Sequence, residues 1–149
     1  MKPLFPTRLC SVLALLLLAL SAGALHAKTV AVAETGFTLT LPDNYSVSPT
    51  DFSGVLLQAD SPSGESSVQV VAGVPGAPVN ALAGDYEMKM NSVFPNLLTV
   101  SEDRVLIGEQ SHLLKQYVAE SDAGKIEIAA LFFTNIGQSM IAHAVDIGG

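Results

Sequence analysis

His112 and His143 are the residues of this 149-residue chain whose side chains are best suited to bind a metal or to move a proton. A metal site usually draws on closely spaced ligands, and neither histidine has a second ligand type two or four positions further along. A site formed by both histidines across neighbouring strands, completed by Glu120 or Asp146, would make the protein a metal-dependent hydrolase. The sequence favours the simpler interpretation, in which the two histidines are unrelated structural or surface residues.

The other residue patterns that support catalysis are missing or incomplete. The serines lack a G-x-S-x-G elbow, and the only cysteine, Cys10, falls in a predicted leader. Glu102 and Asp103 are adjacent carboxylates, but neighbouring residues of a strand point to opposite faces. The glycines within residues 73–76 lack the lysine of a phosphate-binding loop. We therefore predict no catalytic residue, no metal and no cofactor, and a protein that is not an enzyme.

Three side chains form the candidate partner-binding surface. Tyr45 and Phe52 fall near the ends of predicted elements, where they would line a groove between the first strand and the hairpin that follows it. The competing interpretation is that both aromatic rings cap the core. Met88 is expected on the exposed side of a helix, where a flexible thioether suits an adaptable binding face.

Residues 1–27 have the layout of a cleavable Sec-type signal peptide. Lys2 and Arg8 provide a positive start, residues 9–20 are rich in leucine, and small residues follow. The apolar run is shorter than the ~20 residues that a membrane-spanning helix needs. We therefore expect a protein of the periplasm, or a secreted one, with no membrane span after the leader is removed.

The mature chain is expected to be one small domain covering residues 28–149. Cleavage after Ala27 is favoured, and cleavage after Ala24 is the alternative. From Lys28 onward five basic residues face fourteen acidic ones, which gives a net charge of about −9. This charge argues against nucleic acids and anionic membranes as partners. A chain that is 49% hydrophobic and 14% charged is not intrinsically disordered.

Alternating apolar residues predict an antiparallel sheet of about six to seven strands. The expected strands cover residues 37–41, 54–60, 67–74, 97–107, 110–119, 125–134 and 138–147. Turn residues separate them, and the second and third strands should form a hairpin. The adjacent acids Glu102 and Asp103 predict a bulge or bend within the long fourth strand.

A single helix is expected between the third and fourth strands. Asn80 resembles an N-cap, and Leu82, Tyr86, Met90 and Val93 recur at spacings of three and four residues. Because so short a helix is unstable alone, these residues should pack on the sheet. Asp85 and Lys89, four residues apart, are placed to pair on its exposed side.

The last two predicted strands are apolar on both faces, which is typical of strands covered on both sides. Ile141, His143 and Val145 share one face, so His143 is expected to be a partly buried structural residue. One helix covers one face only. The other face must be covered by the N-terminal segment 29–33, by a partner chain, or by a C-terminal helix that this chain lacks.

The order of these elements resembles the PsbP-like fold and, within it, the DcrB-like bacterial envelope proteins. The resemblance begins with the strand of residues 36–42, which ends in Pro42 with Tyr45 after it, and continues through a hairpin, one helix and a long meander. It implies an α+β fold, an envelope location, and roles in binding or assembly. The family usually adds a helix after the last strand, and Gly149 comes first, so we expect the fold without that helix. A truncated or degenerate family member is the further interpretation.

We therefore expect a non-enzymatic protein that binds or assists another envelope component. The expected mechanism is burial of an apolar partner segment, from an envelope protein or peptide, against the sheet face that the helix leaves uncovered. The alternative is a homodimer that closes this face with a second copy.

Overall fold

The computed structural model describes residues 26–32, 35–50, 54–107, 109–135 and 138–148. Most of the predicted leader, Phe52 and the centre of the last predicted turn lie outside these residues. Within them, no helix is long and apolar enough to cross a membrane.

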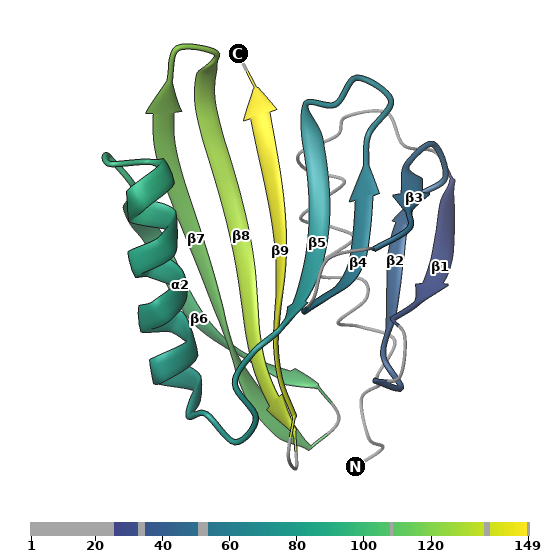
Figure 1. Cartoon of the computed structure of the whole chain (residues 1–149), viewed down its shortest axis with the longest axis vertical. Coiled ribbons are helices and arrows are strands. Elements are labelled where there is room, and N and C mark those ends of the chain that lie inside the picture. Colours follow the sequence, from purple (N-terminus) through teal and green to yellow (C-terminus); the bar gives the residue numbers. More distant parts are fainter. Residues whose placement is uncertain (1–25, 33–34, 51–53, 108, 136–137, 149) are drawn as a thin grey trace.

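A seven-stranded antiparallel sheet forms the centre of the described structure (Figure 1). The strand order is β3-β4-β5-β9-β8-β7-β6. Its strands are β3 (Ser46–Ser48), β4 (Val55–Asp60), β5 (Ser66–Ala72), β6 (Leu98–Ile107), β7 (Gln110–Ser121), β8 (Gly124–Asn135) and β9 (Gln138–Gly148). The last strand, β9, lies between β5 and β8 and so joins the β3–β5 hairpins to the β6–β8 meander.

Two further elements complete the fold. A separate two-stranded sheet consists of β1 (Ala27–Ala31) and β2 (Thr38–Pro42), and the helix α2 spans Val79–Val93. All seven predicted strands and the predicted helix are present within a few residues of their expected bounds. The predicted α+β class with an antiparallel sheet and one helix is therefore confirmed for the described residues.

The helix differs from its prediction at both ends. It begins at Val79 with the extended Pro78 as its N-cap, so Asn80 is inside the first turn and does not cap it. Val93 is 63% exposed. Phe94, which ends the helix, packs against the core cluster and takes the position expected for Val93.

The bulge in β6 also lies elsewhere than predicted. The pairing of β6 with β7 shifts register between Thr99 and Ser101, which leaves Val100 as the extra residue. Glu102 stays in register opposite Lys115, and its carboxylate lies 3.4 Å from the lysine nitrogen. The acidic pair is therefore part of the regular strand.

Each face of the sheet carries its own core. On one face, α2 packs over β7, β8 and β9, and its Leu82, Ala83 and Tyr86 join a cluster with Tyr117 and Phe132. Glu87 fastens the helix there, because its carboxylate accepts hydrogen bonds from Lys115 Nζ and from Tyr117 Oη. Ion pairing and hydrogen bonding thus add to apolar burial in holding α2 on the sheet.

The opposite face is covered by the N-terminal hairpin. Val32 and Leu41 are buried in one cluster with Leu131 and Met140 of the sheet. The rings of Phe37 and Phe133 lie 5.1 Å apart, centre to centre. The expectation that this face would stay open for a partner is therefore wrong. Of the three covers that the sequence left open, the N-terminal segment is the one found.

Candidate functional site: a groove between the helix and the sheet

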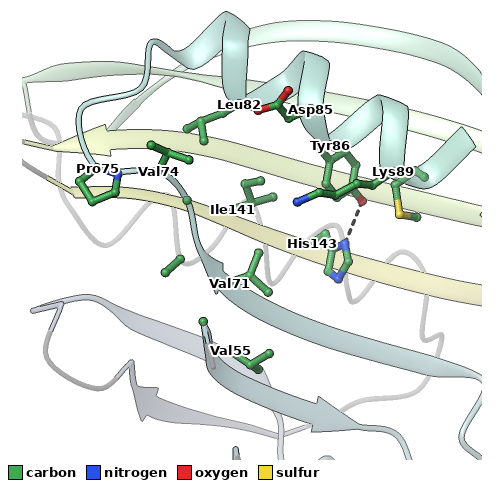
Figure 2. A pocket seen from close by; sticks show the side chains of 14 residues that line it. Val55, Val71, Val74, Pro75, Leu82, Asp85, Tyr86, Lys89, Ile141 and His143 are labelled. Carbon is green, nitrogen blue, oxygen red and sulfur yellow. Dashed lines mark hydrogen bonds between the residues drawn. The ribbon is translucent and has the colours of Figure 1, made fainter. Parts of the chain in front are cut away.

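A groove of about 630 Å³ runs between α2 and the β4–β5 side of the sheet (Figure 2). Its floor is apolar and comes from three strands, with Val55 on β4, Val71 on β5 and Ile141 on β9. The helix provides the facing wall with Leu82 and Tyr86, among others. The groove exists because α2 lies toward the β7 side of the sheet and leaves β4 and β5 uncovered on this face (Figure 1).

Gly73 brings the connector after β5 close to the helix. A Cβ atom at this position would lie 2.6 Å from Leu82 Cδ2 and 3.1 Å from Ser139 Cβ. The Gly73 amide donates to the Ser139 carbonyl at 2.6 Å. This close approach positions Val74 and Pro75, which line the groove where the connector passes (Figure 2).

A row of hydrogen-bonded side chains crosses the sheet from the groove wall. Tyr86 Oη lies 2.8 Å from His143 Nδ1, and His143 Nε2 lies 3.2 Å from Gln69 Oε1. Gln69 Nε2 donates to Gln58 Oε1, and Gln58 Nε2 donates to Asp60 Oδ1, both at 2.9 Å. Because Gln69 Oε1 only accepts, His143 carries its proton on Nε2 and accepts the Tyr86 hydroxyl at Nδ1. One neutral tautomer therefore satisfies every link.

Burial keeps both partners of the first link uncharged. It lowers the pKa of His143 to about 4 and raises the pKa of the Tyr86 hydroxyl far above its usual range. The Tyr86 ring also meets Phe132 edge-on, with ring centres 5.3 Å apart. The wall is thus rigid and neutral at physiological pH, with both histidine nitrogens engaged.

Charge is confined to the rim. Asp85 and Lys89 of α2 line the groove, and both side chains are exposed. In the view of Figure 2, Lys89 extends across the front of Tyr86. The predicted pair does not form, because no ion pair within 4.0 Å joins Asp85 to Lys89 in this described part of the helix. Both charges are therefore available to a bound molecule.

The fold matches that of a protein of known structure. The solution structure of cyanobacterial PsbP (CyanoP) from Synechocystis sp. PCC 6803 aligns with a TM-score of 0.64 at 10% identity, over 86% of this chain and 84% of that one. This chain has a PsbP-like fold. The crystal structure of PA94, a protein of unknown function from Pseudomonas aeruginosa, aligns with a TM-score of 0.48 at 13% identity, over 81% of this chain and 83% of that one. No protein-family model matches the sequence, and no curated protein does.

The PsbP-like fold was predicted from the order of the elements and is confirmed. The narrower likeness to the DcrB-like envelope proteins stays a prediction. At 10% identity the match with CyanoP concerns the fold alone.

The PsbP-like fold does not bring the three predicted surface residues together. Tyr45 is 2% exposed and belongs to the core beneath the N-terminal hairpin, so the expectation that it lines a surface groove is wrong. Phe52 lies outside the described residues. Met88 is 68% exposed, as expected, but it is not among the residues that line the groove.

The two histidines lie on opposite faces of the sheet. His112 is buried against the ring of Phe133 in the N-terminal core, and this burial lowers its pKa. His143 is paired with Ala130, which belongs to the core on the helix side. The two rings therefore cannot share a metal ion, and the described residues hold no group of three or more His, Cys, Asp or Glu residues placed for one.

Sequence reasoning placed Tyr86 on the buried side of the helix and His143 as a partly buried structural residue, and both placements are confirmed. It missed the row of hydrogen bonds. Gln69 and His143 are 74 residues apart and meet only because β5 pairs with β9. A glutamine facing the same side of β5 as the apolar Val71 was the available signal.

Proposed function

We propose that this chain is a non-enzymatic periplasmic protein that binds an apolar segment of another envelope component in the groove beside α2. The observation that carries the proposal is the apolar floor of Val55, Val71 and Ile141, open beside a rigid wall. A volume of about 630 Å³ is within the usual range of ligand sites. The leader predicted from residues 1–27 supports the location.

A binding role agrees better with the polar groups of the groove than catalysis does. His143 donates from one ring nitrogen and accepts at the other, so it has no free lone pair for a substrate proton. Its low pKa keeps it neutral. The hydroxyl of Tyr86 and both ring nitrogens of His143 already have hydrogen-bond partners, so an apolar side chain can lie against this wall without breaking a hydrogen bond. At the rim, Asp85 and Lys89 can orient the polar backbone of the bound segment.

The groove can be tested with the fluorescent apolar anion anilinonaphthalene sulfonate. We expect the folded protein to enhance its fluorescence, and Val74→Glu to weaken binding by about tenfold, because a carboxylate at the groove would repel the anion. Val93→Glu is the matched control, since both valines are more than 60% exposed and Val93 does not line the groove.

A second probe tests whether the groove takes a peptide. A synthetic octapeptide of alternating valine and threonine should displace the dye from the wild type. No enhancement by the wild type, or equal binding by the two glutamate variants, would contradict the proposal. Thermal unfolding of each variant checks that it is folded.

A further inference from the structure

We propose that two copies of this chain associate through β6, so that their sheets continue into one another. The strand is the outermost of the sheet and pairs with β7 on one side only within the described residues. Its ten residues leave a row of backbone N–H and C=O groups on the other side. Such a row is a template for another strand. This inference is independent of the groove.

The exposed apolar side chains of β6 indicate that a partner covers the free edge of this strand. Leu98 is 64% exposed, Val100 is 57% exposed and Leu106 is 69% exposed. Few large apolar side chains of the described residues are exposed, and three of them belong to this one strand. Leu98 and Val100 lie at one end of the strand and Leu106 at the other, on either side of the exposed charged residues 102–104, so both ends of the edge offer apolar groups to a partner.

The occupant we infer is a second copy, because β6 is complementary to itself. Backbone groups along a strand point alternately to its two sides, so an antiparallel copy must pair residues of the same parity. The two-fold axis then passes through a residue. With the axis at Asp103, Glu102 lies opposite Arg104 of the second copy, and Arg104 lies opposite its Glu102. The regular part of β6, residues 101–107, carries this pairing, because the bulge at Val100 interrupts the alternation beyond it.

The neighbouring registers are worse. An axis at Glu102 places the two copies of that carboxylate opposite each other and leaves Arg104 facing the bulge at Val100. An axis at Arg104 opposes two guanidinium groups and sets Glu102 against Leu106. Like charges directly opposite destabilise a strand pair, whereas opposite charges and apolar pairs stabilise it. Of these three registers only the Asp103 axis pairs opposite charges, and its unfavourable contact is the one between the two Asp103 side chains.

Sedimentation equilibrium of the mature protein at physiological salt tests the interface. We expect a concentration-dependent dimer. Arg104→Glu and Glu102→Arg should each weaken it by about tenfold, because each opposes like charges twice across the axis. The double variant should return to within about threefold of the wild type, since the pairs are restored in reverse. Positions 102–104 are exposed, so substitution there leaves the core packing intact. Because Glu102 also pairs with Lys115 within the chain, thermal unfolding of each variant separates an effect on folding from one on association.

Asp103→Asn should strengthen the dimer, whereas the two charge reversals weaken it, and this difference tests the register. The substitution removes the one repulsive contact, so the dimer should tighten by several-fold. Val74→Glu, in the groove, should leave the association unchanged. A monomer at about 100 µM, a double variant no better than the single ones, or a weaker dimer with Asp103→Asn would each overturn the proposal.

Discussion

His143 is held neutral between Tyr86 and Gln69, and this makes the stability of the protein depend on pH. Burial lowers its pKa from 6.5 to about 4. Between these values the unfolded chain binds a proton that the folded chain does not, so the free energy of unfolding falls as the pH is lowered through this window. At about 1.4 kcal/mol per pKa unit, we expect a loss of about 3 kcal/mol.

Urea unfolding of the wild type and of His143→Gln, from pH 7.5 down to pH 4.5, measures this contribution. The variant should lack it, so the stabilities of the two proteins should converge as the pH falls. Burial also lowers the pKa of His112. Because His112 is present in both proteins, its contribution to the pH dependence cancels in the comparison. Parallel pH dependences would show that His143 is not held neutral by the fold.

Tyr86 contributes to the same link from the helix. Tyr86→Phe keeps the ring packing but leaves His143 Nδ1 without its donor, so we expect a loss of about 1–2 kcal/mol in the free energy of unfolding. Tyr117→Phe is the matched control. Its hydroxyl donates to Glu87, which keeps its ion pair with Lys115, so the loss should be smaller. A larger loss for Tyr117→Phe at neutral pH would contradict this account.

At the scale of elements, alanine substitution at two glycines should change the stability of the protein in opposite directions. Gly73→Ala should cost about 1–3 kcal/mol, because its Cβ would meet Leu82 at 2.6 Å where β5 leads into the helix connector. Gly84→Ala should stabilise the protein by up to about 1 kcal/mol, because a Cβ there meets nothing within 4 Å and alanine favours the helix. Chemical denaturation of both variants measures the difference, and equal effects would show that the connector yields freely.

Alternation of apolar and polar residues predicted β4 and β5, whose residues alternate between more and less buried. Apolar runs between turn residues predicted β8 and β9, which have a core on both faces. Neither pattern predicted β3, which is three residues long, or β1, whose residues are mostly exposed or half-buried. The groove could not be predicted, because it depends on where α2 rests across the sheet. The helical spacing identifies the side of α2 that is buried, but not the strands that it covers.

At the scale of the whole molecule, the leader prediction has a direct test. Protein recovered from the periplasm of a host that processes such leaders should have the intact mass of a chain that begins at Lys28, or at Leu25 for the alternative site. Lys28 then ties the new N-terminus to the turn after β2, since its ammonium donates to the backbone oxygens of Asp43 and Tyr45. An intact mass that still includes residues 1–24 would contradict the prediction.

The position of β9 at the centre of the sheet dictates the order in which the protein can fold. The meander from β6 to β9 pairs neighbours in sequence, whereas Ser66 of β5 meets Asp146 of β9 across 80 residues. Because distant pairings close large loops, they form more slowly than local ones. We expect the C-terminal half to assemble first and β5 to join its free edge afterwards. The N-terminal hairpin packs against Met140 of β9 and Phe133 of β8. The first described residues to be synthesised should therefore be the last to pack against the sheet.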